Sequence, residues 1–170
     1  MVRHLLNLSI IALVAGGCGA TATLAPESDL SFSQQTENAV WVSDVGDHKE
    51  HIRIESGSLF VLPSNPQAQI VQGVYFLRLP DSPTVKFMAQ GSIQKETQGP
   101  IIFRLFLQSP TGFEELGQFS LSESASLLPI EVDLVAHRGQ DVMLVFSVSA
   151  PEGQSLNQVF TLIDPQIIQS

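Results

Sequence analysis

The chain has 170 residues, and its 17 Asp and Glu against 8 Lys and Arg give a formal net charge of −9. So acidic a chain lacks the basic surface that nucleic-acid binding or electrostatic adsorption to anionic lipid requires. Its single cysteine also excludes an internal disulfide.

The first element in chain order is an apolar N-terminal segment. A basic start at residues 3–4 is followed by an apolar run at 5–14 and by small residues at 15–17. This order is typical of an export signal. The run is much shorter than the ~20 residues that a membrane-spanning helix needs. We therefore expect residues 1–17 to be a removable signal peptide, with a buried core helix as the alternative.

Cys18 follows this segment directly. The sequence Ala-Gly-Gly-Cys at residues 15–18 resembles the lipobox of bacterial lipoproteins, although Ala15 replaces the more common Leu. The resemblance implies cleavage before Cys18 and attachment of acyl chains such as palmitate to it. Each buried acyl methylene contributes about 0.8 kcal/mol, so the lipid would hold the protein on a membrane of the bacterial cell envelope, facing the periplasm or the exterior. An ordinary signal peptide with an incidental cysteine is the alternative.

A tether and one domain are expected after the cysteine. Residues 19–30 are small and polar without a period, so residues 18–30 are interpreted as the lipidated cysteine and a flexible tether. The remaining residues, 31–170, match the size of one domain and are enough to bury a core.

Most of this domain has the pattern of β-strands. Residues 50–55 alternate strictly between apolar and polar, which indicates a half-buried strand. Residues 101–107 are apolar on nearly both faces, as in a central strand, and Gly73 is a candidate β-bulge. Further strand-like runs lie between Gly- and Pro-containing turns, at residues 39–45, 58–62, 69–79, 85–89, 113–121, 128–134, 142–148 and 159–168. The pattern predicts an all-β fold, an antiparallel β-sandwich or barrel.

A recurring pattern in the C-terminal half narrows this prediction. Val-Asp-Leu at residues 132–134 precedes Gly-Gln at 139–140 and an alternating apolar strand at 142–146. With two further matching strands, at 99–107 and 160–167, the pattern resembles galactose-binding-like jelly rolls, the fold of many carbohydrate-binding modules. The resemblance spans residues 68–168 and implies a β-sandwich of jelly-roll type.

Within that pattern we expect structural roles for Asp133 and Gly139. Asp133 is placed to cap backbone amides of the turn, and Gly139 to take a positive φ before the next strand. The chain departs from the family at His137, where a Tyr is frequent, and at Asn157 and Gln158, where aromatic residues are frequent. Because sugars stack on exposed aromatic rings, these departures weaken the implication of glycan binding.

The aromatic residues are ten Phe, one Trp and one Tyr. The Phe residues mostly fall on apolar strand faces, so we expect them in the core. Trp41 and Tyr75 are the candidate ligand-binding residues, with core packing as the favoured alternative.

A structural calcium is the one cofactor considered. Jelly rolls of the resembled type often carry one, and Asp44, Asp47 and Asp164 are its candidate ligands. The two His and several carboxylates at residues 44–51 raise zinc as a second hypothesis. Their spacing matches no metal motif, however, and a solvated loop is the preferred interpretation.

We expect no enzymatic activity. Glu114 and Glu115 are adjacent in a strand and should point to opposite faces, and the chain has no Gly-x-Ser-x-Gly elbow. The sequence thus predicts a membrane-anchored envelope lipoprotein with a non-catalytic binding module for a glycan or an envelope partner. The alternative is a structural or assembly subunit that binds another envelope protein through a sandwich face or edge.

Overall fold

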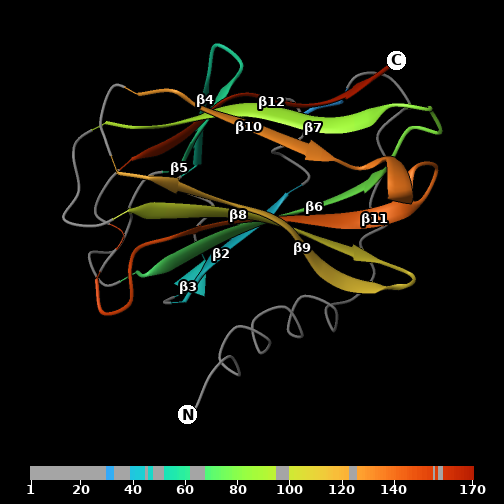
Figure 1. Ribbon diagram of the computed structural model, residues 1–170. Helices are drawn as coiled ribbons and strands as arrows, with labels where there is room; N and C mark the ends of the chain where they lie inside the picture. The colour runs from blue at the N-terminus through green and yellow to red at the C-terminus, as the bar shows by residue number, and fades with distance from the viewer. Residues whose placement is uncertain are drawn as a thin grey trace.

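The structure, a computed structural model shown in Figure 1, consists of two β-sheets that face each other. It describes residues 30–32, 39–44, 46–47, 52–61, 68–94, 100–122, 126–154, 156 and 159–170. The predicted signal peptide and Cys18 lie outside the described residues. Among the described residues, no helix is long and apolar enough to cross a membrane.

The first sheet has the strand order β10–β7–β12–β5–β4, and β1 also pairs with β12. Its strands are β1 (Leu30–Ser31), β4 (Ile52–Glu55), β5 (Ser58–Val61), β7 (Val85–Ile93), β10 (Leu128–Asp133) and β12 (Phe160–Gln169). All pairs are antiparallel, and β12 pairs with β5 before, and with β1 after, an irregularity between Ile163 and Gln166. The sheet therefore includes Leu30, one residue before the predicted start of the domain.

The second sheet has the strand order β3–β2–β6–β11–β8–β9. Its strands are β2 (Val40–Ser43), β3 (Gly46–Asp47), β6 (Ile70–Arg78), β8 (Ile101–Ser109), β9 (Gly112–Leu121) and β11 (Asp141–Ser149). All these pairs are antiparallel as well. The predicted all-β antiparallel sandwich is thus confirmed, and the run at 101–107 forms an interior strand, β8, as expected.

The core lies between the sheets and takes alternate residues from each strand. In β8 the buried residues are Ile101, Phe103, Leu105 and Leu107, while the residues between them lie on the opposite face and are half-buried. Strand β4 shows the alternation predicted for residues 50–55 only in part: Arg53 and Glu55 form an ion pair of 3.1 Å on one face, and Ile52 packs against the core, but Ile54 is 40% exposed. Side-chain parity within the strands therefore follows the sequence pattern.

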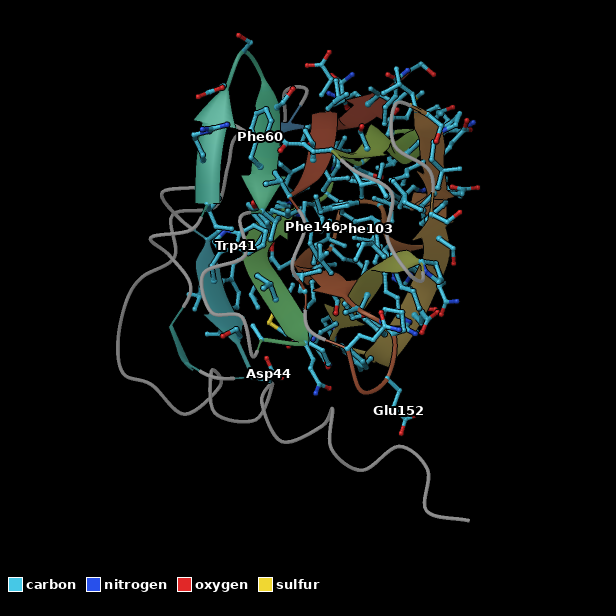
Figure 2. All side chains as sticks on the ribbon, turned by 90° about the vertical axis from the view of Figure 1, so that its left-hand side faces the viewer. Trp41, Asp44, Phe60, Phe103, Phe146 and Glu152 are labelled. Carbon is cyan, nitrogen blue, oxygen red and sulfur yellow. The ribbon has the colours of Figure 1, made fainter. Side chains whose placement is uncertain are left out.

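Aromatic rings fill the centre of this core. Phe146 of β11 lies among the rings of Phe32, Tyr75, Phe87 and Phe103, at centroid distances from 4.9 to 5.8 Å. Figure 2 shows Phe103 and Phe146 in the space between the sheets. The interior thus depends on tilted and edge-to-face ring contacts, the arrangement that aromatic quadrupoles favour.

Gly73 is not a β-bulge, contrary to the sequence prediction. It pairs without interruption with Trp41 of β2 on one side and with Phe146 of β11 on the other. A Cβ atom at position 73 would overlap the ring of Trp41. The glycine therefore makes room for the indole and does not bend the strand.

The connection from β10 to β11 confirms both turn predictions. The Val135 N–H, at the start of the 3₁₀ helix η3 (Val135–His137), donates to Asp133 Oδ1 over 2.9 Å. Gly139 has a φ of +68°, and its N–H donates to the carbonyls of Leu79 and Pro80. This part of the jelly-roll pattern is therefore structural.

Candidate functional site

Trp41 and Tyr75 belong to the core. Each is 2% exposed, and their rings meet edge to face at 6.1 Å. Figure 2 shows Trp41 on the inner side of its strand. Both residues have the strand parity that faces the opposite sheet, so an exposed ligand contact at either residue is wrong and the core alternative is correct.

The candidate calcium ligands do not converge. Asp44 follows β2 in the second sheet, where its carboxylate accepts from the backbone N–H groups of Gln69 and Ile70 over 3.1 to 3.4 Å. Asp164 lies in the irregularity of β12 in the first sheet, with a φ of +47°, and its Oδ1 approaches the backbone at Gly57. The described residues contain no group of three His, Cys, Asp or Glu side chains that could hold a metal ion.

The side chain of Asp47 and residues 48–51 lie outside the described residues. The calcium and zinc hypotheses therefore stay predictions. What the structure adds is that the two carboxylates contact different backbone segments, Asp44 at Gln69 and Ile70 and Asp164 near Gly57.

The outer face of the second sheet carries a row of side chains with an exposed Phe at each end. Across four neighbouring strands, the cross-strand partners are Phe76, Met143, Gln108 and Phe113. Phe76 and Phe113 are 39% and 41% exposed. Phe106 stacks on Phe113, with ring centroids 5.4 Å apart and an interplanar angle of 15°. We call these five residues the aromatic face; with strands ~4.8 Å apart, its row of four is about 14 Å long.

A polar row borders the aromatic face. It consists of Gln72, Ser147, Arg104 and Gln118, which are cross-strand partners on β6, β11, β8 and β9. Gln72 and Ser147 are buried although they lie on the outer face. Arg104 Nε donates to Gln118 Oε1 over 2.8 Å, and its Nη1 donates to Ser149 Oγ over 3.3 Å. Apolar rings and fixed donors and acceptors therefore lie side by side on one surface.

The sequence expectation that most Phe residues lie in the core missed the aromatic face. Its signal was present in the strand parity, because Phe76 stands between Tyr75 and Leu77, which are both buried. Phe106 stands between Leu105 and Leu107 in the same way. An aromatic residue out of phase with the core is therefore the pattern that predicts an outward ring.

Charged side chains elsewhere on the sandwich form pairs between neighbouring elements. Lys86 donates to Glu131 over 2.6 Å, and this hydrogen bond, with the charge of Glu131, raises the pKa of Lys86 above 10.5. Glu114 and Glu115 are both exposed, and Glu114 Oε1 lies 2.8 Å from Nε2 of His137. The adjacent glutamates face different strand partners and form no common site.

Comparison with known proteins gives the fold class. No protein-family model and no curated protein sequence matches the chain. A structure of TmCBM61 in complex with β-1,4-galactotriose has a TM-score of 0.55 at 7% identity, over 78% of this chain and 88% of that one. The N-terminal cellulose-binding domain of β-1,4-glucanase C from Cellulomonas fimi has a TM-score of 0.51 at 12% identity, over 78% of this chain and 88% of that one. A CBM4 structure has a TM-score of 0.50 at 14% identity, over 82% of this chain and 99% of that one.

These likenesses concern the fold, because the identities are low. The chain is a β-sandwich of jelly-roll type with the fold of carbohydrate-binding modules. The fold that the pattern at residues 68–168 implied is thereby confirmed.

Proposed function

We propose that the chain is a lipoprotein of the bacterial cell envelope whose sandwich is a non-catalytic module that binds a glycan on the aromatic face. The observation that carries the proposal is the exposure of Phe76 and Phe113 on the outer face of the second sheet, where Phe106, stacked on Phe113, lies between that row and the polar row. Two proteins of the same fold support it, one in complex with β-1,4-galactotriose and one described as cellulose-binding.

The chemistry of this surface suits a sugar chain. The apolar faces of sugar rings pack on aromatic side chains, and the row from Phe76 to Phe113 is long enough for several rings. Sugar hydroxyls need directed donors and acceptors, which the exposed Gln118 of the polar row supplies directly or through water.

Replacing Phe113 with Ala should weaken glycan binding about tenfold, which corresponds to about 1.4 kcal/mol. The substitution removes an exposed ring and the stacking partner of Phe106. Glycan-array screening of the purified chain, with and without calcium, would identify the ligand, and calorimetry would measure its affinity. β-1,4-Galactotriose and cello-oligosaccharides are the first probes.

Phe60 provides the matched control, because it is a half-buried ring in the first sheet, beneath Arg53 at 5.0 Å. Phe60→Ala should leave glycan affinity unchanged. Equal losses from both substitutions would place the ligand elsewhere.

The anchor forms the second part of the proposal and depends on residues 15–18. Replacing Cys18 with Ser should abolish labelling of the chain by radioactive or clickable fatty acid and should release the protein from the membrane fraction. Labelling that persists in the Cys18→Ser variant would contradict the lipobox interpretation. Ala15→Leu, which restores the more common lipobox residue, is the matched control and should keep full labelling.

The alternative function is a structural subunit that binds another envelope protein through a sheet edge. Strand β9 (Gly112–Leu121) is one edge of the second sheet, but its register shifts opposite Leu105 and Phe106, and Glu114 and Glu115 are exposed on it. Bulges and edge charges oppose strand addition. Failure to bind any glycan, together with co-purification of one envelope protein, would favour this alternative.

A further inference from the structure

Arg104 differs from the other described cations in its charge environment. Every other Arg and Lys side chain among the described residues has a carboxylate partner. The pairs are Arg53–Glu55, Arg78–Asp141, Lys86–Glu131 and Arg138–Asp81, at 2.6 to 3.7 Å. In a chain with 17 Asp and Glu, a guanidinium without an acidic partner in the described part of the chain is an exception.

The partners of Arg104 fix its position, and within the described residues they leave its charge unpaired. Its Nε and Nη1 donate to the neutral oxygens of Gln118 and Ser149. A guanidinium has five N–H donors, and the hydrogen bonds to described residues use only Nε and Nη1, so donors remain there for a ligand. Because Arg104 is half-buried and partial burial penalises an unpaired charge, an anionic ligand at this position would gain a charge-assisted hydrogen bond.

The distance along β8 connects this charge to the aromatic face. Arg104 and Phe106 lie two residues apart on the same face of the strand, so their Cα atoms are roughly 7 Å apart. A sugar ring that packs on Phe106 and Phe113 can therefore direct a substituent toward Arg104. The planar guanidinium fork matches a carboxylate in a bidentate arrangement.

We propose that this surface selects glycans that contain uronic acids, with Arg104 receiving the sugar carboxylate; the inference rests on the proposed glycan-binding function. The net charge of −9 opposes an acidic polymer at long range, but this repulsion is screened beyond about 8 Å at physiological ionic strength. Close to the site Asp141 pairs with Arg78, and the exposed Glu115, the cross-strand partner of Phe106, offsets the charge of Arg104, so the net local charge is near zero. Selectivity therefore depends on the local guanidinium.

The test compares oligosaccharides that differ only at C6. β-1,4-Linked glucuronate oligomers carry a carboxylate where cello-oligosaccharides of equal length carry a hydroxymethyl group, and galacturonate oligomers pair with galacto-oligosaccharides in the same way. The full-length chain should bind the acidic member of one pair at least tenfold more tightly. Arg104→Gln should weaken acidic binding about tenfold and neutral binding less than threefold, and Arg104→Lys should recover part of the acidic binding.

The outcomes separate this inference from the function on which it rests. Equal affinity of the full-length chain for acidic and neutral members, or equal weakening of both by Arg104→Gln, would overturn the uronic-acid inference and leave glycan binding intact. If the chain binds neither acidic nor neutral oligosaccharides, both the uronic-acid inference and the proposed glycan-binding function are overturned. If Arg104→Gln lowers the melting temperature sharply, a salt titration of the unaltered chain replaces it as the test. Added NaCl should weaken binding of the acidic oligosaccharides and leave binding of the neutral ones unchanged. The absence of that difference would also overturn the uronic-acid inference.

Discussion

Replacing Phe146 with Ala should lower the free energy of unfolding by about 3–5 kcal/mol, the range for deletion of a buried aromatic ring. The ring of Phe146 is fully buried and lies at the centre of the aromatic cluster. Its neighbours come from both sheets and from Phe32, just after β1. Because β-sheet backbones on two sides hold these neighbours, they cannot collapse fully into the cavity, and the loss should lie at the upper end of the range.

Chemical denaturation followed by fluorescence of Trp41 measures this effect. The matched control is Phe113→Ala, which removes the same side chain from the outer face of the second sheet and should cost about 1 kcal/mol or less. A domain of this size has about 5–15 kcal/mol of total stability, so Phe146→Leu is a milder companion variant. A loss at Phe146 no larger than that at Phe113 would contradict the description of the core. The control also shows whether the binding loss expected for Phe113→Ala occurs in a folded protein.

The sequence predicted which residues form strands and which of their faces look inward, because both depend on local alternation. Residues 101–107 have the predicted parity, and the roles of Asp133 and Gly139 follow from turn chemistry within a few residues. The outward direction of Phe76 and Phe106 also follows from local parity, but their assembly into the aromatic face does not. Whether Phe106 meets Phe113 depends on the register between β8 and β9, and a non-local pairing of this kind leaves little trace in one sequence.

Gly73 is a single position at which the sequence alone also could not reveal a contact with another strand. A glycine within a strand predicts either a bulge or the close approach of another group, and the sequence of β6 does not distinguish them. The distinction depends on β2, which places Trp41 opposite Gly73. The polar row has a similar origin, since Gln72, Ser147, Arg104 and Gln118 come from four separate strands and meet only through the sheet order.

Replacing Gly73 with Ala should destabilise the protein by about 1–3 kcal/mol, the usual cost of overpacking a core. The new Cβ would overlap the Trp41 ring, and the indole cannot withdraw because Tyr75 contacts it edge to face. Thermal unfolding measures the loss. Gly91 of β7 is the matched control, since a Cβ there meets the movable methyl ends of Leu121 and Ile130 at 3.1 and 3.2 Å, so Gly91→Ala should cost less.

Repeating the Gly73→Ala substitution in a Trp41→Leu variant tests whether the indole of Trp41 causes the loss of stability. In a Trp41→Leu variant, which is itself destabilised by the loss of a large buried ring, the Gly73→Ala substitution should change sign. With the ring absent, alanine in a strand is better than glycine by roughly 0.5–1 kcal/mol, because glycine loses more backbone entropy on folding. Trp41→Leu also removes an indole N–H that has no acceptor among the described residues, which offsets part of its own cost. If Gly73→Ala were equally destabilising with Trp41 and with Leu at position 41, the strain would lie in the backbone of β6, and the fit of Trp41 over Gly73 would not be the reason for the glycine.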